Sequence, residues 1–315
     1  MRRRKVWLAL SVLLMVSLVL AGCNSKKMYT MVTGGTGGTY YPLGGEIANI
    51  ISDETGIEVT ATTSNASADN VADISAGDAH IGFVQTDVMT YAVEGINAFE
   101  GKPVDNVLAL GALYPETVQI VTLAKSGIQS VDDLKGKKVS VGAPGSGTYV
   151  NAQQILEIHG LDIESDIQAQ HLDFDASVSG LQDGTIDAAF ITAGTPTGSV
   201  MGLAATNPVK IVSISKDKAD ELIVKYPFYA HDTVAKGTYD GQDEDAHTVA
   251  VLAMLAVAKD LPEDDVYKMT KAIYENVDKL THAKKEFIKL ETALNGIGID
   301  LHPGAEKYYK EKGLK

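Results

Sequence analysis

The chain has 315 residues, of which 45% are hydrophobic and 22% are charged, and its formal net charge is −14. This composition is typical of a globular protein of about two domains, and it argues against a disordered chain or a protein with many membrane spans. All three arginines and Lys5 lie within the first five residues, so the rest of the chain is more acidic still. We expect it to bind neither nucleic acid nor an anionic membrane surface. Any anion that it binds must be held without an arginine side chain.

The amino terminus has the pattern of an export signal. Arg2–Lys5 is cationic, Val6–Leu20 is apolar, and Leu20-Ala-Gly-Cys23 follows. The apolar run is shorter than the roughly 20 residues of a membrane-spanning helix, so residues 1–22 are predicted to be a cleaved signal peptide. Leu-Ala-Gly-Cys resembles the bacterial lipobox, whose cysteine becomes lipid-modified. We therefore expect an extracytoplasmic lipoprotein anchored through Cys23, with residues 23–29 as a tether; a signal peptide with an incidental cysteine is the alternative.

From Met28 onward, short β-branched runs alternate with longer amphipathic segments, which predicts an α/β architecture. The predicted strands, in chain order, are 27–33, 58–62, 81–84, 138–142, 188–191 and 210–215, and the predicted helices follow 34–42 and 143–149, cover 218–225 and begin at Pro262. The stretch 109–123 is extended and suits a crossover between domains. The apolar run 248–258 leads back.

Two parts of the chain resemble each other. Gly38-Thr-Tyr40 and Gly147-Thr-Tyr149 both stand between a predicted strand and a predicted helix. Further along, 74–87 aligns with 181–194 without a gap, at nearly the same distance from each loop. Two lobes of one architecture are the simplest interpretation, and common α/β sequence patterns are the alternative. We assign 30–118 to the first lobe, 119–227 to the second, and 228–315 to a return segment with helices that pack on the first lobe.

The Gly-rich loops suit an anion. A loop that opens onto a helix exposes unpaired backbone N–H groups at the positive end of the helix dipole, and this favours a carboxylate or phosphate. Neither loop has the third glycine of the dinucleotide fingerprint or the lysine of a phosphate-loop NTPase. Two such loops facing one another across a cleft could hold one small dianion, although each alone could equally be a tight structural turn.

Polar residues that follow other strands could reach the same cleft. Gln85 can donate to a carboxylate or accept from an ammonium group, and Asp87 could pair with a ligand amine or cap the helix that begins at Val88. Ser64 and Asn65 could contact ligand or form a turn. The expected ligand contacts are Gly37, Gly38, Thr39, Tyr40, Tyr41, Ser64, Asn65, Gln85, Asp87, Ser146, Gly147, Thr148, Thr192 and Gly194.

The lipobox, the loop 35–42, the segment from Gly77 through Gln85 to Asp87, the loop 145–148 and Leu301-His-Pro-Gly-Ala305 with Tyr308-Tyr309 together resemble the TAXI family of TRAP transporter solute receptors. The resemblance implies a two-lobed periplasmic-binding-protein fold, type II-like, with a ligand cleft between the lobes. It also implies capture of a small organic anion or amino acid, such as glutamate, glutamine, 2-oxoglutarate or a related dicarboxylate. The partner would be a TRAP-type membrane permease driven by a sodium gradient. The other large TRAP receptor family is known for a substrate-binding arginine, which this chain lacks beyond its first residues.

Other functions have weaker support. The seven histidines show no metal-ligand spacing, and the acidic loop 240–245 lacks the spacing of an EF-hand. No Gly-x-Ser-x-Gly elbow is present, and Cys23 is the only cysteine, so neither a hydrolase serine nor a thiol in the folded body is indicated. We expect no enzymatic activity, no metal and no cofactor. A lipid-anchored ligand sensor for a signalling partner is the main alternative, and an enzyme on the same two-lobed fold is a further one.

Overall fold

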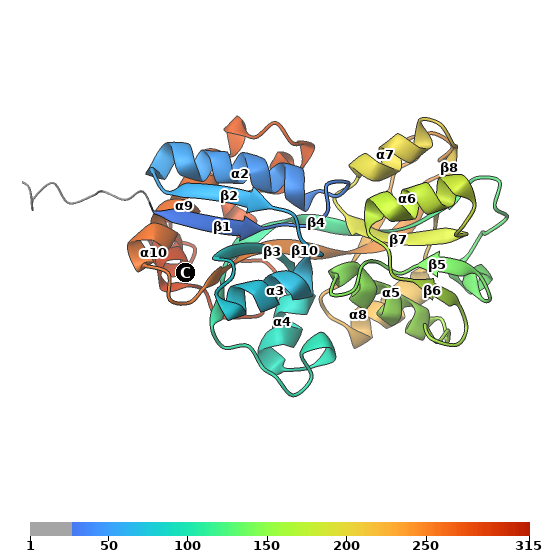
Figure 1. Cartoon of the computed structure of the whole chain (residues 1–315), viewed down its shortest axis with the longest axis horizontal. Helices are drawn as coiled ribbons and strands as arrows, with labels where there is room; N and C mark the ends of the chain where they lie inside the picture. The colour runs from blue at the N-terminus through green and yellow to red at the C-terminus, as the bar shows by residue number, and fades with distance from the viewer. Residues whose placement is uncertain (1–26) are drawn as a thin grey trace, which may run out of the picture.

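The computed structural model describes residues 27–315, so the predicted signal peptide and Cys23 lie outside the described residues. Figure 1 shows two lobes joined by two long strands, β4 (Val107–Leu123) and β10 (Ala246–Ala258). The described strands form one mixed sheet in the order β2-β1-β3-β10-β4-β7-β5-β6, with β8 added on β4 and β9 added on β10. The α/β fold, predicted from the alternation of segments, and its two lobes, predicted from the sequence repeat, are confirmed.

The first lobe contains three parallel strands, β1 (Met28–Val32), β2 (Glu58–Thr62) and β3 (Ile81–Gln85). Helices lie on both sides of them: α2 (Tyr40–Thr55) on one, and α3 (Ser67–Ala76) and α4 (Thr86–Glu94) on the other (Figure 1). A short turn of helix, η1 (Asn97–Phe99), follows. β3 lies between β1, to which it is parallel, and β10, to which it is antiparallel. Because helices cover both faces of the sheet there, β3 is buried along its whole length.

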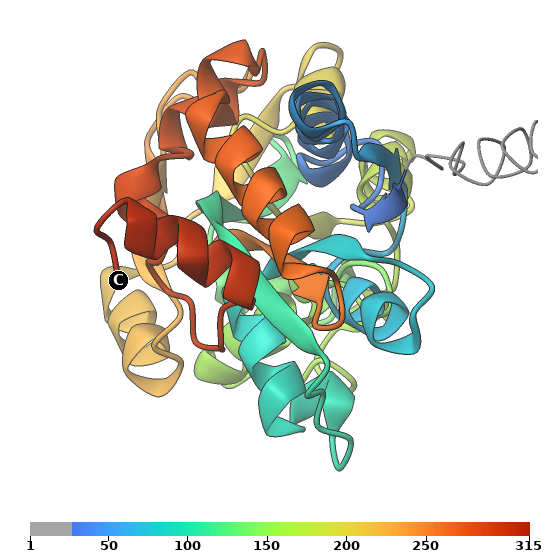
Figure 2. The same ribbon diagram turned by 90° about the vertical axis from the view of Figure 1, so that its left-hand side faces the viewer.

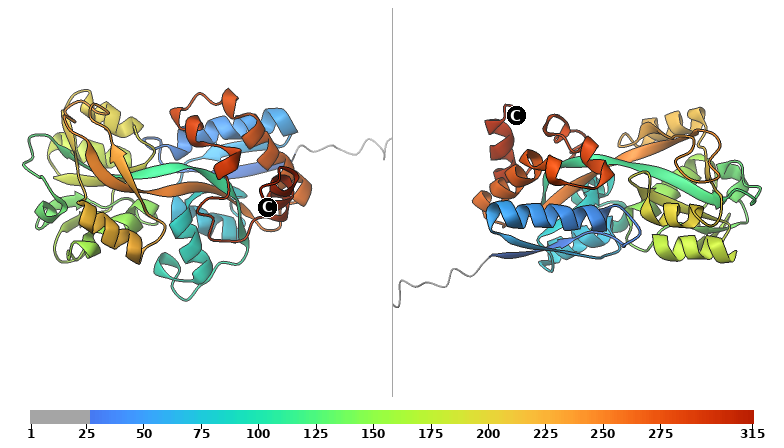
Figure 3. Two further views of the ribbon diagram at one scale, coloured as in Figure 1. Left: turned by 180° about the vertical axis from the view of Figure 1, so that it is seen from behind. Right: turned by 90° about the horizontal axis from the view of Figure 1, so that it is seen from above.

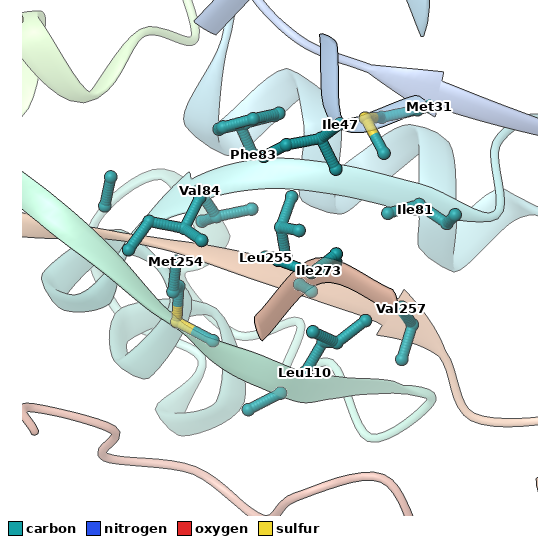
Figure 4. Close-up of a cluster of buried hydrophobic side chains, with 14 of the residues drawn as sticks. Met31, Ile47, Ile81, Phe83, Val84, Leu110, Met254, Leu255, Val257 and Ile273 are labelled. Carbon is teal, nitrogen blue, oxygen red and sulfur yellow. The ribbon is translucent and has the colours of Figure 1, made fainter. Parts of the chain in front are cut away.

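Figure 4 shows the core between these layers, where Met31, Ile47 and Phe83 pack beside Leu255 of β10 and Ile273 of α9. All five side chains are at most 1% exposed. Burial of such side chains contributes about 1.5–3 kcal/mol each relative to exposure, and it fixes the end of β3 where Gln85 stands.

The second lobe repeats this plan. Its strands are β5 (Lys138–Ser140), β6 (Gln168–Gln170), β7 (Ala188–Ala193), β8 (Val209–Val212) and β9 (Ala230–Val234). Its helices are α5 (Gly147–Ile158), α6 (Phe174–Asp183), α7 (Gly198–Ala204) and α8 (Lys216–Lys225), with the turn η2 (Val131–Leu134). The repeated sequences occupy equivalent places: Gly77 and Gly184 both end a helix in the left-handed conformation, with φ of 84° and 70°.

The carboxy-terminal segment returns to the first lobe. Figure 2 shows α9 (Glu263–Glu275) and α10 (Pro303–Glu311) crossing one end of that lobe. Between these two helices the chain forms the short turns η3 (Val277–Lys279), η4 (Ala283–Phe287) and η5 (Leu290–Thr292). Tyr308 and Tyr309 of α10 are fully buried in the first lobe's core. The helix predicted to begin at Pro262 begins one residue later, at Glu263, with Pro262 at its N-cap and three acidic residues in the first turn.

The two lobes meet where β4 and β10 pass from one hydrophobic core to the other. In β4 the change falls between Tyr114 and Val118, and in β10 between Val251 and Ala253. The register of β10 against β4 shifts between Leu252 and Met254, at the same place. Figure 3 shows these two strands running through both lobes. The predicted ranges 30–118, 119–227 and 228–315 remain our proposal for the lobes, although Val234 and Val249 pack in the cores of the second lobe.

Candidate ligand-binding site

A cavity of about 520 Å³ lies between the lobes. The first lobe supplies the amino ends of α2 and α3, the end of β3 and the middle of β4, and the second lobe supplies the amino ends of α5 and α6 and the end of β7. In α/β proteins, loops after the carboxyl ends of parallel strands are the usual place for a ligand. The cavity is formed by the ends of β3 and β7 and by helices α2 and α5, which follow the neighbouring strands β1 and β5.

Both predicted Gly-rich loops line this one cavity. Gly38, Thr39 and Tyr40 lie at the start of α2, and Ser146, Gly147 and Thr148 lie at the start of α5. Ser146 is the N-cap of α5 and its hydroxyl accepts a hydrogen bond from the N–H of Tyr149 at 3.1 Å. The first N–H groups of a helix have no intrahelical partner, so each loop offers amide donors to the cavity.

Thr39 and Thr148, the two threonines of the repeat, make equivalent hydrogen bonds. The hydroxyl of Thr39 lies 3.1 Å from the N–H of Gly194, and the hydroxyl of Thr148 lies 3.4 Å from the N–H of Thr192. Each hydroxyl therefore accepts a hydrogen bond from the end of β7. The contact from Thr39 crosses between the lobes, whereas that from Thr148 stays within the second lobe.

The other sequence-predicted residues fall into two groups. Ser64, Asn65, Gln85 and Thr192 line the cavity, whereas Gly37, Tyr41, Asp87 and Gly194 lie outside its lining. Tyr41 is 37% exposed on the surface of α2. The carbonyl of Gly37 accepts a hydrogen bond from the N–H of Ser199 at 3.0 Å, so Gly37, like Gly194, takes part in contact between the lobes.

Asp87 is fully buried in the first turn of α4. The helix begins at Thr86, two residues before the predicted start, and Gln85 is its N-cap. Burial raises the pKa of Asp87 to about 6, against hydrogen bonds from the backbone N–H groups of Val88 and Asp87 and from Asn151 that lower it. Nδ2 of Asn151, on α5, lies 3.2 Å from Asp87 Oδ2. Asp87 therefore lies outside the cavity lining and takes part in a contact between the lobes.

Sequence reasoning missed the most buried acidic residue of the cavity, Glu116. It lies in the middle of β4, is 2% exposed and lines the cavity. The hydroxyls of Tyr40 and Tyr114 donate to its carboxylate at 2.6 and 3.4 Å. Burial raises the pKa of Glu116 to about 8, only partly offset by hydrogen bonds from Tyr40, Gln85 and Tyr114, and nearby Asp87 raises it further. A signal was present, because Glu116 is the only charged residue in the 17 residues of β4.

The cavity has a negative lining. Four more acidic residues line it, Asp69, Asp73, Asp173 and Asp175, and no lysine, arginine or histidine of the described chain does. Phe174 supplies an aromatic surface. The described residues 27–315 contain no cluster of three or more His, Cys, Asp or Glu side chains placed to hold a metal ion. Backbone amides and hydroxyls are therefore the groups on this lining that suit an anion.

A model of the NMT1-like family matches residues 31–313. The chain belongs to this family. NMT1-like proteins are periplasmic solute-binding proteins, so the resemblance to solute receptors is confirmed at this level. Within the described part, no helix combines the length and apolarity needed to cross a bilayer.

Solved structures show the same fold. A protein from Bordetella bronchiseptica RB50 is 19% identical, with 92% of this chain and 81% of that one covered and a TM-score of 0.56. A periplasmic transporter is 15% identical, with 92% and 93% covered and a TM-score of 0.55. The substrate-binding protein of an amino acid ABC transporter is 15% identical, with 78% and 91% covered and a TM-score of 0.47. The first two share the two-lobed α/β fold of this member of the NMT1-like family.

Proposed function

We propose that this chain is the extracytoplasmic solute receptor of a TRAP-type transporter, of the TAXI kind. It captures a small organic anion or amino acid, such as glutamate, glutamine, 2-oxoglutarate or a related dicarboxylate, between its lobes and delivers it to the membrane permease. One observation carries the proposal: two helix amino ends, one from each lobe and alike in sequence, line a single cavity of a size suited to such a solute. Membership of a solute-binding family supports it.

The mechanism follows from contacts that join the lobes beside the cavity. The hydroxyl of Thr36 donates to Asp175 at 2.9 Å, and the N–H of Ala68 donates to the carbonyl of Gly145 at 2.9 Å. Both contacts join the two lobes, so separation of the lobes would break them. A solute that touches both lobes adds interaction energy to the closed form alone, so binding shifts the population toward closure. A permease that recognises the closed surface would then accept only the loaded receptor.

Differential scanning fluorimetry against amino acids and C4 to C6 dicarboxylates tests the proposal, because a ligand of the folded state raises the melting temperature. Two variants identify the site. Ser146→Glu places a carboxylate in the cavity, and Gly38→Val adds side-chain atoms where a Cβ already lies 3.3 Å from the Phe174 ring. Both variants should remain folded, and calorimetric titration should show that they no longer bind the solute. Unchanged affinity in both would contradict the assigned site.

The anchor and the permease need separate tests. Cys23→Ser should move the protein from the membrane fraction to the soluble fraction, and retention in the membrane would contradict the lipid anchor. Uptake of the bound solute by cells that express this chain with a TRAP-type permease should stop when the sodium gradient is abolished. Two outcomes would favour the sensor alternative. One is uptake that does not depend on the permease, and the other is tight solute binding to the receptor without any uptake.

A further inference from the structure

The charge of the cavity lining conflicts with a ligand that is only an anion. Five carboxyl groups line the cavity and no cationic side chain does. Helix amino ends attract an anion over a short range, and each contributes about half a unit charge. A dicarboxylate would bring two negative charges toward five acidic groups. A ligand that also carries a positive charge would be attracted by the same lining.

The hydrogen-bonding groups beside Glu116 also favour a ligand that carries a positive charge. Gln85 is 2% exposed and lines the cavity, and its Oε1 has no hydrogen-bond partner among residues 27–315. An amide oxygen can only accept, so this position lacks a donor. The carboxylate of Glu116 accepts hydrogen bonds from the hydroxyls of Tyr40 and Tyr114 and from the side chain of Gln85, and its two oxygens have capacity for about one more. A buried acceptor without a donor costs free energy, which a ligand N–H group would recover.

We propose that the cavity selects ligands with a protonated amine, which Glu116 and Oε1 of Gln85 receive, while a carboxylate of the same ligand lies at the helix amino ends of Thr39 and Thr148. The ligand class is then a small zwitterion of the amino acid type, and acids that lack the amine bind weakly. This inference rests on the proposed function and narrows its ligand class. It separates glutamate and glutamine from 2-oxoglutarate.

The surroundings of Glu116 allow it to change its charge with the ligand. The groups that act on it are Tyr40 of α2, Tyr114 of β4, Asp87 of α4 and Lys284 of η4. Lys284 is the one cation in this set, and it does not line the cavity. Burial raises the pKa of Glu116 to about 8, so at neutral pH the empty site largely holds a proton there. An ammonium group favours the ionised carboxylate and should release this proton, whereas an anion should retain it.

The experiment uses the folded, unlipidated chain and pairs of compounds. Each common L-amino acid is compared with the carboxylic acid that lacks its amine, for example L-glutamate with glutarate, by thermal shift and then by isothermal titration calorimetry. We expect amino acids to raise the melting temperature and their amine-free counterparts to bind at least about tenfold more weakly, the effect of about 1.4 kcal/mol. Titrations in two buffers of different protonation enthalpy should show proton release at pH 7.

Glu116→Gln keeps the shape of the side chain and removes its charge. Because the variant loses one partner of a buried charge pair, its affinity for the amino acid should fall about thirtyfold or more. The matched control Asp183→Asn removes one charge at an exposed position outside the lining and should bind normally.

Three results decide the matter. Amine-free acids that bind as tightly as amino acids, or proton uptake on binding, would overturn the inference but leave the receptor function standing. If no compound of either class raises the melting temperature, the proposed function itself fails. If Glu116→Gln does not fold, the wild-type pairs and the proton count still decide, because they need no variant.

Discussion

The approach of Gly147 to Gln85 gives a direct test of lobe closure. Gly147 opens α5 in the second lobe, and Gln85 ends β3 in the first. A Cβ atom on Gly147 would overlap the side-chain amide of Gln85, to which its three nearest atoms all belong. Gln85 is 2% exposed and has little room to move. Gly147→Ala should therefore obstruct the closed form while leaving each lobe able to fold.

The magnitude follows from the cost of overpacking, about 1–3 kcal/mol for extra carbon in a packed site. This cost falls on the closed form alone. Because the ligand binds by closing the lobes, the loss of affinity should equal the cost of closure, or about 5- to 150-fold in Kd. The melting temperature of the unliganded protein should change little.

Calorimetric titration with the amino acid that gives the largest thermal shift measures this loss, and small-angle scattering measures closure as a fall in the radius of gyration. Gly202→Ala is the matched control, since a Cβ there meets nothing within 4 Å. Gly37→Ala should have a smaller effect than Gly147→Ala, because the atom that it meets first belongs to the exposed side chain of Asp175, which can turn away. Wild-type affinity in Gly147→Ala, with full compaction on binding, would refute the reasoning.

Three further predictions concern stability. Burial raises the pKa of Glu116 from 4.5 to about 8, so between these pH values the folded state keeps a proton that the unfolded state loses. The free energy of unfolding of the unliganded protein should therefore fall as the pH rises from about 4.5 to about 8. In urea titrations Glu116→Gln should reduce this slope. An equal slope in the variant would contradict it. Asn151→Leu removes the one side-chain hydrogen bond that Asp87 receives within the described part of the chain, and also the 2.7 Å bond to Tyr229. It should therefore lower stability by about 1–3 kcal/mol and weaken ligand binding. Unchanged stability and unchanged binding would exclude this contact as a link between the lobes. Phe190→Ala should cost about 3–5 kcal/mol in urea unfolding because Phe190 is fully buried, against about 0.5 kcal/mol or less for Val224→Ala at an 86% exposed position.

Local sequence patterns predicted most of the fold. The strand predicted over 58–62 is β2, and the two Gly-rich loops open helices α2 and α5 as expected. These features depend on nearby residues, such as β-branched runs and glycine at helix ends. β9 was missed because Ala230–Val234 is mostly exposed and lacks hydrophobic alternation, and it is held by pairing with β10. The continuity of β4 and β10 through both lobes is likewise a property of long-range pairing.

The site was predictable only where the chain repeats itself. The recurrence of Gly-Thr-Tyr pointed to two loops, and both line the cavity. Glu116 comes from β4, which was interpreted as a connection with no functional residue. Its place beside Tyr40 depends on how a strand passes beneath a helix 76 residues earlier in the chain, and no local pattern reports this. The same holds for Gly37, whose carbonyl faces Ser199 across the lobes.

The two loops are alike in sequence, yet closure gives their glycines different partners. A side chain on Gly147 would meet the buried amide of Gln85, and one on Gly37 would first meet the exposed carboxylate of Asp175. In both cases the first obstacle belongs to the opposite lobe, so the missing side chains serve closure as well as amide exposure. A chain without arginine in its folded body has only short-range donors for a carboxylate, and such donors act strongly only once water is excluded. Tight closure is therefore the condition under which twin helix ends can replace a guanidinium group, and this is why we expect Gly147→Ala to weaken binding without any change in the charge of the site.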